Sequence, residues 1–281
     1  MRILLLSNDK MEVQLKILVL IKQVPDMENV RFDREKGKID RSSACTEINP
    51  FDLNALETAL QIRESTGAAV TAITMGPPQA EEALREAIAR GADEGILLTD
   101  MKFGGSDVKA TSSILSAAIK KIGEYALIVA GIQTVDGDTG QVGPEIAGFL
   151  NIPHISNIEE IKGYSENDIE VICGAWDSRY LKKGKFPLLI TVTKDVNVPR
   201  LPSFKNKMKA RKAEIIKWSC DDLKEIIDET KIGLKGSPTK VKKIEVPTLA
   251  TREGKLYKDN DERAVSDIVN VLKEKRVLKE A

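Results

Sequence analysis

The sequence predicts an α/β protein with three layers, α/β/α, doubly wound around a mostly parallel sheet. An extra antiparallel hairpin and an extended C-terminal arm that ends in a helix complete the expected fold. Short apolar runs alternate with stretches of helical spacing through about residue 155, which is typical of parallel strands joined by right-handed crossovers. Residues 158–172 then alternate like an antiparallel hairpin. A Gly-, Pro- and Lys-rich stretch at 235–262 leads into an amphipathic helix at 262–278.

The predicted parallel strands are short runs of apolar, often β-branched residues, the pattern of strands that helices cover on both faces. They lie at 16–24, 69–75, 94–98 and 125–131, and a further strand is predicted beyond the hairpin at 186–192. The predicted helices place apolar residues at helical spacing next to capping signals. They lie at 53–65, after Asn49 and Asp52 as candidate caps and before Gly67; at 80–91; at 108–122, after Ser106 and Asp107; and from Pro144 onwards, with Pro144 at the first helical position.

Four segments carry weaker patterns. Residues 31–43 are polar and predict a loop or an exposed hairpin, and residues 176–185 predict a turn region. Residues 199–212 are basic and predict an exposed loop that leads into a helix. A further helix is expected over 220–228.

The predicted organisation has three parts. They are an N-terminal extension at 1–14, in which Met1 and Met11 both stay open as the natural start, an α/β nucleotide-binding domain at 15–234, and a C-terminal arm at 235–281. A helix at the end of a poorly packed arm has to bury its apolar face, so we expect a partner chain to cover it.

The composition argues against several classes of function. Forty-three basic and 43 acidic residues balance, which argues against a nucleic-acid-binding protein. One histidine and three separated cysteines without a CxxC spacing argue against a catalytic triad, a metal site and a disulfide framework. No run approaches the ~20 apolar residues of a membrane span, so we expect a cytoplasmic protein without membrane insertion. Redox or group-transfer chemistry would then depend on a bound cofactor and not on a catalytic side chain.

The most informative segment is 129–144, VAGIQTVDGDTGQVGP, in which a strand leads through a glycine-containing loop into a helix. Glycines let backbone N–H groups approach a ligand closely, and a helix N-terminus favours phosphate. The GxxGxxG spacing is neither the dinucleotide-binding fingerprint nor a Walker A loop. Asp136 and Asp138 would repel a phosphate, so we expect them to bind ribose hydroxyls or backbone N–H groups. The neutral donors of this loop are Gln133, Thr134, Thr139 and Gln141. From the spacing alone, nucleotide binding and an ordinary tight strand-to-helix connection both stay open.

Two more polar segments precede helices at the same predicted sheet edge, namely Asn49-Pro50 and Ser106-Asp107, the latter followed by Thr111. Each alone is typical of a plain helix cap. Because ligands bind at the carboxyl ends of parallel strands, the three segments together favour a shared nucleotide pocket. In the basic segment 199–212, Phe204 is an apolar residue of the kind that docks a partner protein.

Several segments together resemble the β subunit of electron transfer flavoproteins. They are KILVLIKQVPD at 16–26, NPFD at 49–52, TMGPPQAEEALREAIARGAD at 74–93, QTVDGDTGQVGPEIAGFL at 133–150 and PRLPSFKNKMKARK at 199–212. The resemblance extends from residue 15 to near the C-terminus and implies a heterodimer with an α subunit that carries FAD. Ordinary β subunits of this family hold a structural AMP. The GDTGQVGP form resembles the electron-bifurcating group, whose β subunit holds a second FAD in the same pocket.

This resemblance implies that the β-subunit FAD accepts a hydride from NADH. One electron then passes through the α-subunit FAD to an acyl-CoA dehydrogenase or reductase, and the other passes to ferredoxin or flavodoxin. Relative to ordinary members, Gly137 replaces an acid and Gly140 a bulkier residue, which makes room for FAD. A conventional AMP-holding subunit is the alternative, and a stand-alone nucleotide-binding sensor or hydrolase-like module is a further one that the long arm disfavours.

The resemblance also assigns two sets of residues. The implied cofactor-binding residues are Leu20, Asn49, Phe51, Asp52, Met75, Asp107, Thr111, Gly131, Gln133, Thr134, Val135, Asp136, Gly137, Asp138, Thr139, Gly140, Gln141, Val142, Gly143 and Pro144. The implied partner-docking residues are Leu201, Phe204, Lys205, Lys207, Met208 and Lys209. Phe204 stands where the family usually has an aliphatic residue, so the identity of the dehydrogenase stays open.

Overall fold

The computed structural model describes residues 16–26, 31–33, 38–40, 46–240, 257 and 262–277. The chain divides into two units, Met1–Lys240 and Val241–Ala281, and each is described by itself. The expected N-terminal extension at 1–14 lies outside the described residues, as does much of the expected C-terminal arm.

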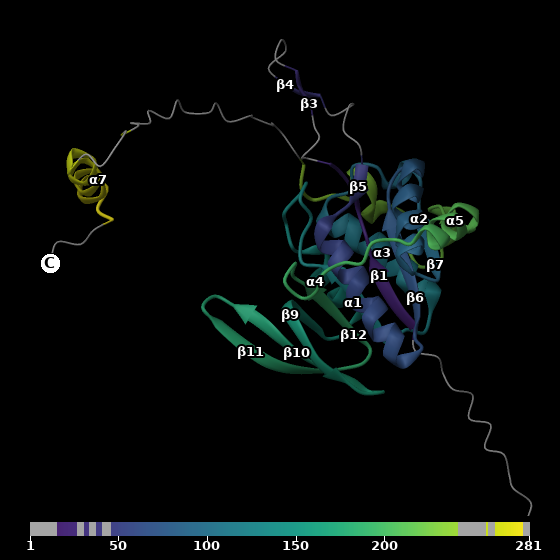
Figure 1. Ribbon diagram of the computed structural model, residues 1–281. Coiled ribbons are helices and arrows are strands. Elements are labelled where there is room, and N and C mark those ends of the chain that lie inside the picture. The colour runs from purple at the N-terminus through teal and green to yellow at the C-terminus, as the bar shows by residue number, and fades with distance from the viewer. Residues whose placement is uncertain are drawn as a thin grey trace, which may run out of the picture. The chain divides into compact units, whose positions relative to one another are not determined.

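A nine-stranded sheet runs through the described part of the first unit, in the order β11-β10-β9-β12-β8-β1-β6-β7-β13 (Figure 1). Its strands are β1 (Lys16–Leu20), β6 (Ala69–Met75), β7 (Glu94–Leu98), β8 (Leu127–Gly131), β9 (His154–Tyr164), β10 (Asp168–Ala175), β11 (Ser178–Lys185), β12 (Leu188–Val192) and β13 (Ile216–Trp218). All neighbours from β9 to β13 in this order pair in parallel. The chain builds β6 and β7 on one side of β1 and then crosses to β8 on the other side. The sheet is therefore doubly wound, as predicted, and its order reverses between β1 and β8.

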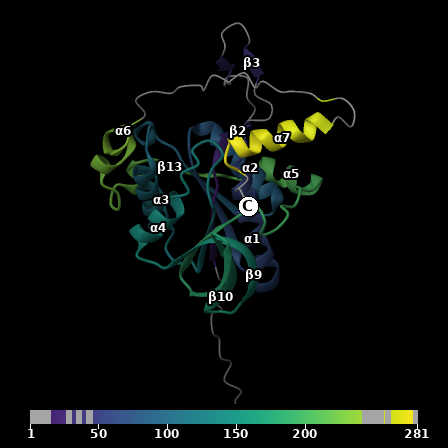
Figure 2. The same ribbon diagram turned by 90° about the vertical axis from the view of Figure 1, so that its left-hand side faces the viewer.

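Helices cover both faces of the sheet (Figure 2). They are α1 (Pro50–Thr66) and α2 (Glu81–Arg90) on one face, and α3 (Val108–Ile122) and α4 (Val142–Leu150) on the other. The side chains of β1 alternate between the two cores: Ile17 and Val19 pack with the first pair of helices, and Leu18 and Leu20 with the second. This two-sided burial is the reason that the strand sequences are continuously apolar. A further helix, α5 (Phe204–Lys212), packs against α2.

The hairpin predicted over 158–172 is confirmed by the antiparallel pairing of β9 with β10. The turn predicted over 176–185 is wrong beyond its first two residues, because β11 begins at Ser178 and pairs with β10 along its length. As an exposed edge strand, β11 buries almost nothing, so its sequence lacks the alternation that indicates a strand. A short hairpin of β3 (Arg31–Asp33) and β4 (Lys38–Asp40) confirms one of the two alternatives for 31–43. A second short pair joins β2 (Gln23–Pro25) to β5 (Thr46–Ile48).

The helix predicted over 220–228 is wrong. The segment holds a single 3₁₀ turn, η4 (Asp221–Leu223), preceded by the strand β13, which sequence analysis missed. Backbone N–H groups in this region are hydrogen-bonded to side chains and not to the carbonyls of a helix. Asp222 Oδ2 accepts from the Ser219 N–H at 2.8 Å, and Asp100 Oδ2 accepts from the Cys220 N–H at 2.9 Å. The remaining short elements are η2 (Pro78–Ala80), η3 (Met101–Phe103), η5 (Glu229–Lys231) and α6 (Gly233–Gly236).

The described part of the second unit is mainly α7 (Glu262–Glu274), which agrees with the helix predicted at 262–278. Its apolar residues Val265, Ile268 and Val271 follow helical spacing and are exposed. Across the described segments of both units, every helix is too short or too polar to span a membrane.

Candidate functional site

The candidate site lies where the strand order reverses, at the carboxyl ends of β1 and β8. The loop that leaves β8 runs from Ile132 to Gln141 and leads into α4. The first turn of α1 lies beside this loop and contributes Asn49 and Asp52, as the contacts below show. Two of the predicted segments, Asn49-Pro50 and the loop within 129–144, therefore meet at one sheet edge.

Asp52 joins the ends of the two strands at the point of reversal. It is only 5% exposed, and its carboxylate accepts hydrogen bonds from two backbone N–H groups, that of Lys22 at 2.8 Å and that of Gly131 at 3.2 Å. Burial raises the pKa of Asp52 to about 7, against the lowering effect of these hydrogen bonds and of the Lys22 charge. Gly131 has to be glycine here, because a Cβ would collide with Asp52 Oδ1 and would lie 2.8 Å from Phe51. Asp52 thus positions the loop and does not offer a free carboxylate.

Asn49 holds the first residues of the loop. Its buried side chain donates from Nδ2 to the Gln133 carbonyl oxygen at 2.9 Å, and its Oδ1 accepts from the Val135 N–H at 3.1 Å. A single amide that pairs with one acceptor and one donor of the same loop defines both its position and its direction. The sequence indicated a plain helix cap as one alternative, but the Asn49 side chain reaches across to the β8–α4 loop.

The middle of the loop contains the two acids and two of the glycines. Asp138 and Gly140 have φ values of +54° and +63°, a left-handed conformation that glycine adopts readily. Lys22 Nζ pairs with the Asp136 carboxylate at 2.6 Å. Burial alone would raise the pKa of Asp136, but the hydrogen bonds from Lys22 and Thr134 outweigh it and hold this pKa below its usual range. The charge that would repel a phosphate therefore has a cation directly beside it.

The N-terminus of α4 follows the loop. The helix begins at Val142, so Pro144 is its third residue and the prediction that Pro144 is the first is wrong. Proline is tolerated there because the N–H groups of the first turn have no intrahelical partner. Gly143 allows the helix to pack closely on β12, since a Cβ would lie 2.7 Å from Thr191 Cγ2. The N–H groups of Val142 and Gly143 thus form a helix N-terminus that suits an anion.

The other predicted cofactor residues lie around this centre. Leu20 and Met75 end the neighbouring strands β1 and β6, and both contribute to the core under α3 and α4. Thr111 lies in the first turn of α3, where its N–H donates to the Asp107 carbonyl oxygen at 2.9 Å. These positions agree with the predicted sheet edge, and a direct role in cofactor binding stays a prediction for each of them.

Asp107 is engaged as a helix cap and as an anchor for a later segment. Its carboxylate accepts from the Ala110 N–H at 3.0 Å, and from the Thr239 N–H and hydroxyl at 2.9 and 2.8 Å. Burial alone would raise the pKa of Asp107, but these hydrogen bonds outweigh it and hold this pKa below its usual range. The residue therefore ties the end of the first unit to the α3 N-terminus.

The predicted docking residues lie on α5 and the loop before it. Leu201 and Phe204 are 85% and 81% exposed, and the remaining members are exposed as well: Lys205, Lys207, Met208 and Lys209. The helix itself is held from behind, where Ala210 is buried and Arg85 of α2 donates to the Ala210 carbonyl oxygen at 2.8 Å. An exposed apolar tip on a basic, well-anchored helix is a surface suited to protein docking.

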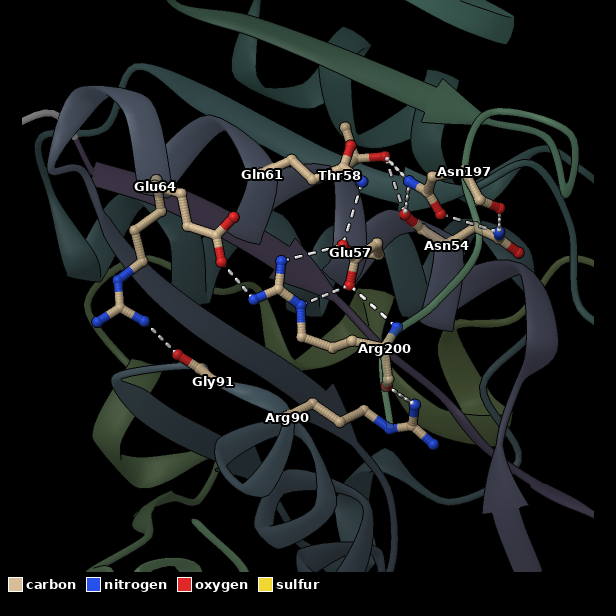
Figure 3. A network of polar contacts seen from close by, with 10 residues as sticks. Asn54, Glu57, Thr58, Gln61, Glu64, Arg90, Gly91, Asn197 and Arg200 are labelled. Atoms are coloured by element: carbon tan, nitrogen blue, oxygen red, sulfur yellow. Dashed lines mark hydrogen bonds and ion pairs between the residues drawn. The ribbon is translucent and has the colours of Figure 1, made fainter. Parts of the chain in front are cut away.

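Sequence analysis missed two groups of functional interest. One is Lys22, whose position two residues after the end of β1 was a usable signal. The other is a polar network between α1 and residues 194–200, shown in Figure 3, with Glu57 and Arg200 at its centre. Glu57 lies between Leu56 and Leu60 on the buried side of α1, and an acid on a buried face requires a partner.

No cluster of three or more His, Cys, Asp or Glu side chains that could hold a metal occurs within the described ranges. The site itself offers backbone donors, glycines for close approach and an acid, Asp136, that is paired with Lys22. This arrangement suits the phosphate and sugar of a nucleotide.

Comparison with known proteins identifies the family. A family model described as the electron transfer flavoprotein domain matches residues 36–223. The chain is 43% identical over 265 residues to the electron transfer flavoprotein subunit beta of Clostridium acetobutylicum, an alignment that covers 94% of this chain and all of that protein. It is 39% identical over 270 residues to the acryloyl-CoA reductase electron transfer subunit gamma of Anaerotignum propionicum, and 38% identical over 266 residues to the caffeyl-CoA reductase-Etf complex subunit CarD of Acetobacterium woodii. Both of these alignments cover 94% of this chain and the whole relative. The chain therefore belongs to the electron transfer flavoprotein family and is a β subunit, which implies an α-subunit partner.

Proposed function

We propose that this chain is the FAD-binding β subunit of an electron-bifurcating electron transfer flavoprotein. In this proposal the complex oxidises NADH in the cytoplasm. It delivers one electron to ferredoxin or flavodoxin, and the other, through the FAD of the α subunit, to an acyl-CoA dehydrogenase or reductase. The observation that carries the proposal is the Val135–Pro144 loop, whose glycines stand beside a helix N-terminus and whose Asp136 is paired with Lys22.

The residues of the loop fit a flavin dinucleotide. Gly137 and Gly140 have no side chain, so neither position places bulk or charge toward a pyrophosphate. Gly140 adopts a φ of +63°, and a Cβ at Gly137 would lie 3.4 Å from Thr134 Oγ1. The Val142 and Gly143 N–H groups would hold phosphate oxygens. The Lys22 ion pair removes the repulsion that an unpaired Asp136 would exert.

When bound, FAD supplies the redox chemistry, namely hydride acceptance from NADH and electron delivery to two acceptors. The chain itself binds and orients. Asn49 and Asp52 hold the loop against the ends of β1 and β8, and the exposed tip at Leu201 and Phe204 contacts the dehydrogenase. Two of the relatives carry names that associate them with acryloyl-CoA and caffeyl-CoA reductases, which supports an acyl-CoA enzyme as this partner.

Nucleotide stoichiometry tests the proposal. The chain is coexpressed with its α subunit, and the nucleotides that acid releases are counted per heterodimer. We expect two FAD and no AMP. One FAD together with one AMP would show that the β subunit is a scaffold with a structural nucleotide, and it would contradict our interpretation of the loop. A complex that reduces its dehydrogenase from NADH without any dependence on ferredoxin would contradict bifurcation.

A further inference from the structure

We propose that Glu57 and Arg200 are positioning residues that hold the docking segment, residues 199–212, in the orientation needed for electron delivery. The inference rests on the proposed function, in which this segment contacts the acyl-CoA dehydrogenase. Neither residue would touch the flavin or the partner, and both would act through the segment that they hold.

Glu57 and Arg200, together called the clamp, form a two-pronged ion pair (Figure 3). Arg200 Nε donates to Glu57 Oε2 at 2.8 Å, and Arg200 Nη2 donates to Glu57 Oε1 at 3.0 Å. The Arg200 backbone N–H donates to the same Oε2 at 3.1 Å. Glu57 is only 5% exposed, so a buried carboxylate on α1 binds both the side chain and the main chain of Arg200.

Neighbouring contacts hold Arg200 from other sides. Its Nη1 donates to Glu64 Oε1, about two turns further along the same face of α1. Its carbonyl oxygen accepts from Arg90 Nη1 of α2 at 2.5 Å. Arg90 is itself held by Glu86 at 2.6 Å. The backbone of Arg200 is therefore held at its N–H and at its carbonyl, by two different helices.

A second brace holds the chain just before Arg200. Asn54 Nδ2 donates to the Asn197 carbonyl oxygen at 2.9 Å, and Asn197 Nδ2 donates back to the Asn54 carbonyl oxygen at 3.1 Å. Asn197 also donates to Thr58 Oγ1 at 2.8 Å. Asn54, Glu57 and Thr58 share one face of α1, so this face forms a continuous seat for 194–200.

The seat ends where the exposed tip begins. Leu201 follows Arg200 directly, and the next anchored point is the far end of α5, where Arg85 binds the Ala210 carbonyl oxygen. The tip therefore projects between two anchors, and its direction depends on both. The same helix α1 that seats Arg200 also holds the nucleotide loop through Asn49 and Asp52, so one rigid element sets the position of both functional regions. Glu57 lies five positions after Asp52, a rise of about 7.5 Å along the helix.

The test compares Glu57→Gln and Arg200→Lys with the wild-type heterodimer. Glutamine keeps the shape of Glu57 and loses the ion pair, and lysine keeps the charge of Arg200 and loses the two-pronged geometry. The control is Glu159→Gln, which removes an ion pair outside α1 and the docking segment: Glu159 Oε2 of β9 lies 2.7 Å from Arg179 Nε of β11. Each preparation is checked for wild-type flavin content and for a cooperative thermal transition.

Two measurements follow for each variant. The first is amide hydrogen exchange by mass spectrometry in peptides that cover 199–212. The second is electron delivery from NADH to a purified acyl-CoA dehydrogenase of the same organism, set against reduction of a tetrazolium dye. We expect faster exchange in 199–212 and a loss of at least ~10-fold in kcat/KM for the dehydrogenase, mainly through KM, with dye reduction within about twofold of wild type. We expect the control variant to match wild type in both measurements.

Dehydrogenase reduction at the wild-type rate in both variants would overturn the inference, and so would equal losses with dehydrogenase and dye. Phe204→Ala, measured in parallel, separates this result from a failure of the proposed function. If Phe204→Ala slows delivery and the two clamp variants do not, the clamp alone is refuted. If Phe204→Ala also leaves delivery unchanged, the docking role of the segment is refuted.

Discussion

Replacing Asp52 by asparagine should change the pH dependence of stability in a direction that the structure determines. Burial raises the pKa of Asp52 from 3.8 to about 7, so between these values the folded chain holds a proton that the unfolded chain does not. The stability that this proton contributes is fully present below about pH 4 and is lost as the pH rises through about 7. Asparagine does not titrate, so the variant lacks this dependence.

The magnitude follows from the same two pKa values. A difference of one between two pKa values corresponds to about 1.4 kcal/mol. The difference of about three between the unfolded and folded pKa of Asp52 therefore corresponds to roughly 4 kcal/mol. The free energy of unfolding of the wild type, minus that of the variant, should therefore fall by roughly 4 kcal/mol between about pH 4 and pH 8. An added constant of about 1–3 kcal/mol is expected at every pH, because the asparagine amide can accept from only one of the two backbone N–H groups.

Urea unfolding of the heterodimer, followed by circular dichroism at matched protein concentration, measures this difference. Asp107→Asn is the control of opposite sign. The pKa of Asp107 is lowered in the fold, so its contribution is present at neutral pH and lost as the pH falls through the acid range. A wild-type-minus-Asp52→Asn difference that stays constant within about 1 kcal/mol across the range would refute the view that Asp52 is buried and protonated on folding.

Three further substitutions test the site and the docking tip. Gly140→Glu should exclude FAD from the β-subunit pocket, because the charge and bulk of the glutamate would meet the pyrophosphate. Gly140→Ala shares the strain of a positive φ but adds no charge, so it should retain more flavin. Equal flavin content in the two variants would contradict our placement of the loop. Asn49→Ala should lower the free energy of unfolding by about 1–3 kcal/mol and weaken nucleotide retention, because it leaves the Val135 N–H and the Gln133 carbonyl without their partner. Thermal unfolding with and without added FAD measures both effects. Phe204→Ala should slow electron delivery to the dehydrogenase and spare NADH oxidation by artificial acceptors, and parallel losses in both assays would argue against docking.

The sequence predicts the parallel core well because burial on both faces leaves an unambiguous signal. Ile17, Leu18 and Val19 are all apolar because successive side chains enter different cores. The same reasoning explains the main error in the sheet. Strand β11 (Ser178–Lys185) is an exposed edge, so its pairing with β10 comes from backbone hydrogen bonds that its polar sequence does not report.

The candidate site is predictable as a location and less so as a set of contacts. The glycine loop and the N-termini of α1, α3 and α4 can be assigned to one sheet edge from chain order alone. The role of Asp52 cannot, because an acid in the first turn of a helix is typical of a dipole contact, and only the fold brings Lys22 and Gly131 to its carboxylate. The pairing of Glu57 with Arg200 spans 143 residues, so the sequence indicates that Glu57 needs a partner without indicating which.

The two buried acids of α1, Asp52 and Glu57, have partners of different kinds. Asp52 accepts from two backbone N–H groups, but burial outweighs these hydrogen bonds and the Lys22 charge, so its pKa rises to about 7 and its charge changes near neutrality. Glu57 faces a guanidinium, and its hydrogen bonds raise the pKa of Arg200 still further above the physiological range. The guanidinium on the docking-segment side therefore stays charged at physiological pH, while the carboxyl that anchors the nucleotide loop titrates near neutrality. A change from pH 6 to about pH 8 should consequently alter nucleotide retention, because the Asp52 carboxyl that anchors the loop loses its proton in this range.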